Sequence, residues 1–110
     1  MDEKVIRKVS EEKDWTVLSL TGRLDRITSP VVGEKAEELL AACCKFAIDV
    51  TDLEYLSSAG IRILLRLAKK AKAAQKSFAI CGAKGFVQDV LEDSNMNVLV
   101  MIFPNRERLG

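Results

Sequence analysis

The sequence alternates between short, almost unbroken apolar runs and longer amphipathic stretches. The runs are KFAIDV (45–50), FAIC (78–81) and VLVMIF (98–103). Between the first two, apolar residues recur with the spacing of one helix face, at Ile61, Leu64, Leu65, Ala68 and Ala71. Buried parallel strands read as continuous apolar runs, and parallel strands need a crossover, which is usually a helix. The alternation therefore predicts a parallel sheet with helices packed on it.

The rest of the chain extends this pattern. KVIRKV (4–9) and WTVLSL (15–20) flank a polar turn and predict an antiparallel hairpin. Two further helices are predicted. One is SPVVGEKAEELLAACC (29–44), with Ser29 as N-cap and Pro30 at the first helical position, and the other is AKGFVQDVLEDSN (83–95), with Phe86, Val87, Val90 and Leu91 on its inner face. The expected fold is α/β, a mixed and mostly parallel sheet in the order β-β-α-β-α-β-α-β, forming one domain over 1–110.

The amino-acid composition argues against several classes of function. The chain has no histidine, the usual general base, partner of a nucleophilic serine and metal ligand. Its three cysteines, Cys43, Cys44 and Cys81, have no zinc-site spacing and are expected to be small core residues in a reducing compartment. We therefore expect no enzyme activity, no bound metal and no cofactor.

The charge distribution is uneven although the formal net charge is +1. No Asp or Glu occurs between Glu54 and Asp89, and that interval contains Arg62, Arg66, Lys69, Lys70, Lys72, Lys76 and Lys84. A basic helix face of this kind indicates a solvated surface, a docking surface for an acidic partner, or a site for nucleic acid or anionic lipid. The lack of aromatic residues on this helix argues against single-stranded nucleic acid.

The targeting signals expected of an exported or membrane protein are missing. The first ten residues, MDEKVIRKVS, are charged and contain no apolar core of a signal peptide. The longest apolar run, at 98–103, is too short to cross a bilayer. The sequence predicts a cytoplasmic protein without membrane insertion.

The stretch YLSSAGIRI (55–63) is the candidate site. It follows the first apolar run through a predicted loop and opens the basic helix, which is expected to run from Ser58 to about Ala74. Functional groups of parallel α/β sheets collect at such strand ends, and a helix N-terminus favours an anion. The two serines are consistent with a helix cap alone or with a phosphorylation acceptor. No sequence motif supports a catalytic serine.

Two segments, LSLTGRLD (18–25) and DVTDLEYLSSAGIRILL (49–65), resemble the signature stretches of the STAS domain. The similarity to the bacterial anti-sigma factor antagonist branch of that family covers nearly the whole chain. The resemblance implies a binding module: unphosphorylated, it binds an anti-sigma factor that is also a serine kinase, and so frees a sigma factor. Phosphorylation by that kinase dissociates the complex, and a serine phosphatase would remove the phosphate. No direct contact with nucleic acid is implied.

The resemblance also implies the site residues. The acceptor position, two residues before the glycine, is Ser58, followed by Ala59 and Gly60. Ser57 is the alternative acceptor because it stands where relatives often carry an acidic residue. The expected partner-binding residues are Asp25, Asp52, Ser57, Ala59, Gly60 and Arg62, with both aspartates at the serine end of the sheet. The last helix of many relatives is expected to be absent or very short here.

Two other functions remain open from the sequence. One is a STAS regulatory or docking subunit of a lipid-transport complex or of a stress-signalling scaffold. The other is a carrier with a small-ligand pocket near the serines. A stable partner that is not a kinase would favour the first, and a co-purifying small molecule would favour the second.

Overall fold

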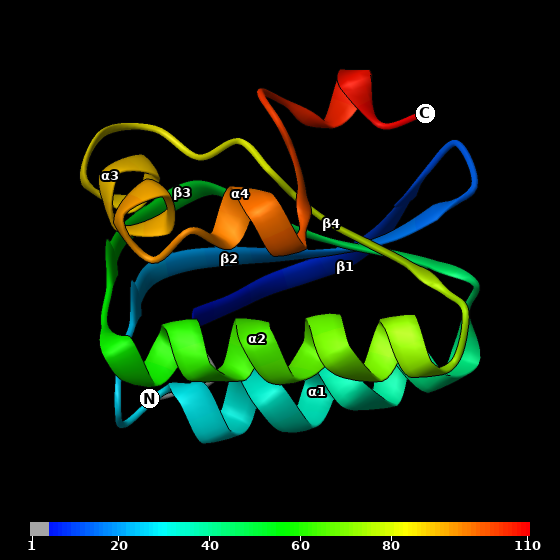
Figure 1. Ribbon diagram of the computed structural model, residues 1–110, viewed down its shortest axis with the longest axis horizontal. Helices are drawn as coiled ribbons and strands as arrows, with labels where there is room; N and C mark the ends of the chain where they lie inside the picture. Colours follow the sequence, from blue (N-terminus) through cyan, green and yellow to red (C-terminus); the bar gives the residue numbers. More distant parts are fainter. Residues whose placement is uncertain (1–4) are drawn as a thin grey trace.

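The computed structural model describes residues 5–110 and contains a five-stranded sheet in the order β1-β2-β3-β4-β5 (Figure 1). Strand β1 (Ile6–Glu12) lies antiparallel to β2 (Trp15–Leu24). The strands β3 (Lys45–Leu56), β4 (Ser77–Cys81) and β5 (Met101–Phe103) follow in parallel. The predicted α/β class and the mixed, mostly parallel sheet are confirmed.

Four α-helices connect and cover these strands. The two longest, α1 (Ser29–Ala42) and α2 (Ser58–Ala73), lie side by side below the sheet in Figure 1. Helices α3 (Gly85–Asp93) and α4 (Met96–Leu99) lie between β4 and β5 in the chain, and a 3₁₀ turn at Arg106–Arg108 is near the end. The observed order, β-β-α-β-α-β-α-α-β, contains one short helix more than the predicted order.

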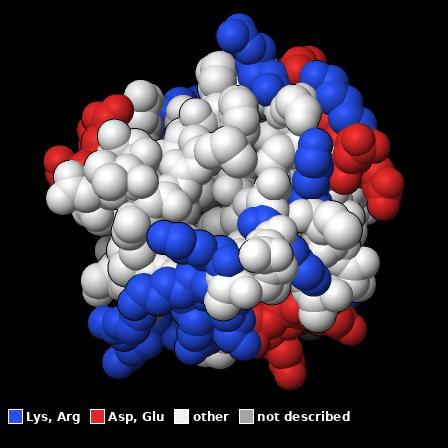
Figure 2. All heavy atoms as spheres, turned by 45° about the vertical axis from the view of Figure 1, so that its right-hand side comes forward, with Lys and Arg blue, Asp and Glu red and all other residues white. Residues whose placement is uncertain are grey.

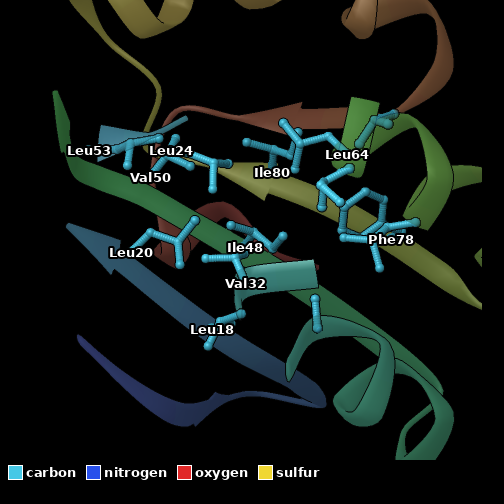
Figure 3. Packing of buried hydrophobic residues seen from close by; sticks show 14 of the residues in the cluster. Leu18, Leu20, Leu24, Val32, Ile48, Val50, Leu53, Leu64, Phe78 and Ile80 are labelled. Atoms are coloured by element: carbon cyan, nitrogen blue, oxygen red, sulfur yellow. The ribbon is translucent and has the colours of Figure 1, made fainter. Parts of the chain in front are cut away.

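The main core lies between α1, α2 and one face of the sheet. Side chains from the central strands, including Leu20 and Ile48, point towards Val32 of α1 and Leu64 of α2 (Figure 3). The two helices approach each other closely at Gly33, where an added Cβ would lie 2.9 Å from Cδ1 of Ile63. This packing fixes α2 in position and with it the serines at its start.

The other face of the sheet carries a smaller buried cluster. Because side chains alternate across a strand, the neighbours of the main-core residues point this way. The cluster comprises Trp15, Val17, Ala47, Ala79, Cys81 and Leu109. Leu109 belongs to the C-terminal segment, which Nζ of Lys13 holds through the carbonyls of Glu107 and Leu109 at 2.7 and 2.8 Å.

Four strand predictions were wrong in length or end point, and β1 continues to Glu12, into the predicted polar turn. Strand β3 continues to Leu56, through residues expected to form a loop, because β2 also continues, to Leu24, and the two pair along this extension. Register shifts between their pairs break the simple alternation that marks a strand in sequence. In contrast, β5 begins only at Met101, because residues 96–99 form α4.

Three side-chain predictions also need correction. The N-cap of α1 is Thr28 rather than Ser29, whose hydroxyl is buried in the first turn and has no hydrogen-bond partner among the described residues. Phe86, expected on the inner face of α3, is exposed. Of the three cysteines only Cys81 is buried, since Cys43 is half-buried and Cys44 is exposed beyond the end of α1.

Candidate functional site

The serine pair lies where β2 and β3 end together. Leu24 and Leu56 are register partners, and the amide of Ser57 donates a hydrogen bond to the carbonyl of Leu24 at 3.0 Å. Helix α2 starts at the next residue, Ser58. The start of α2 is therefore attached to the carboxyl end of a parallel strand pair, the usual place for functional groups in such sheets.

The two hydroxyls have different surroundings. Ser57 has extended backbone geometry and is the N-cap of α2, and its Oγ accepts a hydrogen bond from the amide of Gly60 at 3.5 Å. Ser58 is the first helical residue, and it is exposed. The hydroxyl of Ser57 is thus used for capping. Ser58 is exposed to solvent, beside the unpaired N–H groups of the first turn.

The residues after the serines differ in role. Gly60 is buried, and a Cβ there would lie 2.6 Å from Cδ1 of Leu56 and 3.0 Å from the carbonyl oxygen of Leu24. Ala59 is half-buried, and Arg62 is exposed one turn beyond Ser58. Gly60 thus lets α2 start against the strand ends, whereas Arg62 shares the exposed face of Ser58.

Asp25 organises the connection between β2 and α1. Its Oδ1 accepts hydrogen bonds from the amides of Ile27 and Thr28, at 3.0 and 3.1 Å, and from Oγ1 of Thr28 at 3.2 Å. The backbone hydrogen bond from Thr28, with smaller contributions from Ile27 and Arg23, holds the pKa of Asp25 below its ordinary value against a smaller opposing effect of desolvation. Asp25 follows Leu24 directly, so this turn lies next to Ser57.

Asp52 lies apart from that turn. It is in β3, six residues before the start of α2 at Ser58, and its carboxylate forms an ion pair with Arg7 of β1. With Arg7 it lines a cavity of about 170 Å³, together with Asp49 and Arg106. The structure therefore brings Asp25 and the serines together and places Asp52 with the β1 edge of the sheet.

Four side chains near the serine end were not predicted as site residues. The guanidinium of Arg23 lies 4.0 Å from the ring centroid of Tyr55, and that ring stacks on Phe86 with centroids 5.5 Å apart. Phe86 is 52% exposed, and Ile27, in the Asp25 turn, is 62% exposed. Tyr55 belongs to a stretch that the sequence predicts as a loop, and Phe86 belongs to the predicted inner face of a helix, so the sequence pattern marks neither as a site residue.

Solved structures share this architecture. A proposed anti-sigma factor antagonist of Thermotoga maritima matches with a TM-score of 0.82 and 17% identity, over 94% of this chain and 90% of that one. The phosphorylated form of SpoIIAA, a Bacillus cell fate determinant, matches with a TM-score of 0.69 and 16% identity, over 91% of this chain and 93% of its own. At such identities the likeness shows the fold alone, that of a small α/β domain.

The family is shown by the sequence itself. A family model described as "Mlab, STAS domain" matches residues 8–102, so the chain belongs to the STAS domain family. BtrV of Bordetella bronchiseptica, named as a proposed anti-sigma factor antagonist, is 32% identical over 63 residues, which are 57% of this chain and 54% of BtrV. The alignment thus spans about half the length of this curated relative. Within residues 5–110, no helix has the length and apolar character needed to cross a bilayer.

Proposed function

We propose that the chain is an anti-sigma factor antagonist, a single-domain binding module that works in the cytoplasm without catalytic activity of its own. Unphosphorylated, it binds an anti-sigma factor serine kinase and so releases a sigma factor. Phosphorylation of Ser58 by that kinase ends the complex, and a serine phosphatase restores the active form. Family membership and the name of BtrV support this function.

The two serines have different surroundings, and this difference supports Ser58 as the phosphate acceptor. Ser57 caps α2 through the amide of Gly60, whereas Ser58 is exposed. A kinase can reach an exposed hydroxyl without breaking a cap. A phosphate on Ser58 would meet the N-terminus of α2 and, one turn along, the guanidinium of Arg62, so the fold tolerates it.

The same phosphate would act against a partner that covers the serine end. Its charge of about −1.5 to −2 would have to lose water on burial in the interface. A cost of about 3 kcal/mol would weaken binding more than a hundredfold. The exposed rings and aliphatic side chains around the serines, Phe86 and Ile27, supply apolar surface for the unphosphorylated complex.

The test combines binding and phosphate mapping with each candidate anti-sigma factor kinase of the source organism. We expect Ser58→Ala to bind within a few-fold of wild type and to take up no phosphate from ATP. Ser58→Asp should bind more than a hundredfold more weakly while keeping its circular dichroism spectrum and melting temperature. Ser57→Ala should still be phosphorylated but should lose about 1 kcal/mol of stability with the cap.

Mass spectrometry can assign the phosphate directly. Trypsin cleaves after Lys45 and Arg62, so both serines fall in one peptide, whose fragment ions separate them. Phosphate on Ser57 in the wild type, with full labelling of Ser58→Ala, would make Ser57 the acceptor. Failure of every kinase to bind the wild type would contradict the proposed function itself.

A STAS subunit of a lipid-transport complex or of a signalling scaffold is the second candidate, because the matching family model carries the name Mlab. Such a subunit holds a lasting partner that is not a kinase. Affinity purification under native conditions separates the two functions. A transporter ATPase or scaffold protein that stays bound in the presence of ATP would support the second, and a kinase released by ATP would support the first.

A further inference from the structure

A second surface, at the other end of α2 from the serines, carries exposed apolar side chains. Val98 and Leu99 at the end of α4 are 75% and 59% exposed, and Met101 at the start of β5 is 49% exposed. They fall within four consecutive residues. Large apolar side chains gathered in this way on a soluble domain indicate an interaction site.

A groove separates these side chains from α2. It has a volume of about 380 Å³ and is lined by Ala68, Ala71 and Lys72 of α2, Leu99 and Met101 of the α4–β5 segment, and Lys76 and Phe78. Figure 2 shows Lys and Arg side chains gathered at the lower left, over the helix layer, beside an uncharged surface that is hollowed at its centre. We call this feature the lysine groove.

Lys72, which lines the lysine groove, and Lys69, one turn before it on α2, carry charge that no carboxylate of the described residues neutralises. Arg66 and Lys70 pair with Glu37 of α1 at 3.2 and 3.3 Å. Among residues 5–110, no carboxylate lies within 4.0 Å of the ammonium of Lys69 or Lys72. An acidic side chain of a partner can therefore pair with either without displacing an existing ion pair.

We propose that the lysine groove binds an acidic amphipathic helix of a partner protein. The apolar face of such a helix would enter between α2 and the α4–β5 segment, and its Asp or Glu side chains would meet Lys69 and Lys72. In a helix-in-groove contact of this kind, apolar side chains one turn apart anchor the bound helix. Charge complementarity selects an acidic occupant, and the concave shape suits a helix better than a flat lipid surface.

The lysine groove acts independently of the proposed switch. Ser58, Lys69 and Lys72 follow one stripe of α2, but Ser58 and Lys72 are 14 residues apart, or about 21 Å along the helix axis. A helix in the lysine groove would leave Ser58 uncovered. The module could thus hold one partner permanently while the phosphorylation state of Ser58 governs another.

The experiment uses a labelled 14-residue helical peptide with Leu at i, i+3, i+4 and i+7 and Glu at most other positions, titrated into the ¹⁵N-labelled full chain. The matched peptide has Lys in place of each Glu. We expect the acidic peptide to shift the amides of Ala68, Ala71, Leu99 and Met101 and to bind with micromolar affinity, and we expect the basic peptide not to bind. Ser58→Asp should bind the acidic peptide as wild type does.

Variants distinguish the lysine groove from general charge attraction. Lys72→Glu should weaken the acidic peptide roughly five- to tenfold and reduce its salt dependence. Leu99→Ser should weaken it about tenfold, while Lys8→Glu, an exposed change of the same charge on β1, should change the affinity less than twofold. Equal binding of both peptides, or equal effects of Lys72→Glu and Lys8→Glu, would overturn the proposal.

Two further outcomes would also overturn it. One is binding to vesicles of anionic phospholipid that Lys72→Glu and Leu99→Ser abolish, without binding of the acidic peptide, because the surface would then be a lipid site. The other is a dimer in sedimentation that Leu99→Ser dissociates, because a second copy of the chain would then cover the lysine groove.

Discussion

At the scale of single residues, Gly60 fixes how closely α2 starts against the sheet. A side chain there would overlap Leu56 and approach the carbonyl oxygen of Leu24, which as backbone cannot move aside. We expect Gly60→Ala to destabilise the protein by about 1–3 kcal/mol, as overpacking does. Urea denaturation followed by circular dichroism measures this change.

Gly33→Ala is the matched control. Its added Cβ would mainly meet the flexible end of Ile63, and alanine is the better helix former, so the two effects should nearly cancel. An equal loss of stability in both variants would contradict the backbone contact assigned to Gly60.

The serines show what the sequence can establish about single residues. Their position at a strand end and helix start could be predicted from the change in hydrophobic period. Their separate roles could not, because they depend on the exact residue at which α2 begins. That start is set by the hydrogen bond from the amide of Ser57 to the carbonyl of Leu24, a contact between segments far apart in the chain.

At the scale of elements, the turn between β2 and α1 depends on an ionised Asp25. Its pKa in the folded protein lies below the ordinary value, chiefly through the backbone amide of Thr28. The ionised form thus stabilises the fold above the unfolded pKa, about 3.9, and this contribution is lost as the pH falls through the lower folded pKa. Carboxyl ¹³C titration should place the Asp25 midpoint below about 3.9, the ordinary value for an aspartate.

Asp25→Asn provides the control for this prediction. The variant should be less stable than wild type near neutral pH, and the difference should shrink in acid. A titration midpoint of Asp25 at or above about 3.9, or a stability difference that does not change with pH, would contradict the role of the charge.

The elements that were predicted least well are those whose form depends on a neighbour. The second half of β3 and the end of β2 exist as strands because each supplies the hydrogen bonds of the other across register shifts. The run VLVMIF has high strand propensity, but its first two residues join Met96 and Asn97 in α4, where Met96 is fully buried. A short apolar run cannot by itself distinguish a buried strand from a buried turn of helix.

At the scale of the whole molecule, the C-terminal segment closes the second face of the sheet. Leu109 is fully buried over a cluster that includes Cys81, and burial raises the pKa of that thiol to about 12. We expect Leu109→Ala to cost about 2–4 kcal/mol and to increase the rate of Cys81 alkylation. Iodoacetamide labelling at pH 8, located by tryptic peptide mapping, measures the rate.

Exposed Cys44 is the internal reference for that labelling, because it lies in a different tryptic peptide. Its rate should be the same in both proteins, and in the wild type it should far exceed that of Cys81. Cys81 labelling that Leu109→Ala leaves unchanged would mean that the C-terminal segment does not protect this face.

The overall topology could be predicted because it depends only on the alternation of strands and helices, and each parallel strand pairs with its neighbour in the chain. The packing of the C-terminal segment over the second face of the sheet could not be predicted. The tail PNRERLG reads as a polar end with a single leucine, and nothing in its pattern shows that this leucine lies on Trp15 and its neighbours.

The place of Trp15 has an optical consequence. It is the only tryptophan, 3% exposed beneath the C-terminal segment, with the ring of Phe103 at 6.5 Å and the ammonium of Lys45 at 5.6 Å from its own ring. Trp15 is the first residue of β2 and Leu24, where the serine end begins, is the last, so the two lie at opposite ends of the strand. The tryptophan fluorescence of this protein should therefore change when the C-terminal segment leaves the sheet. It should not change when Ser58 gains or loses a phosphate.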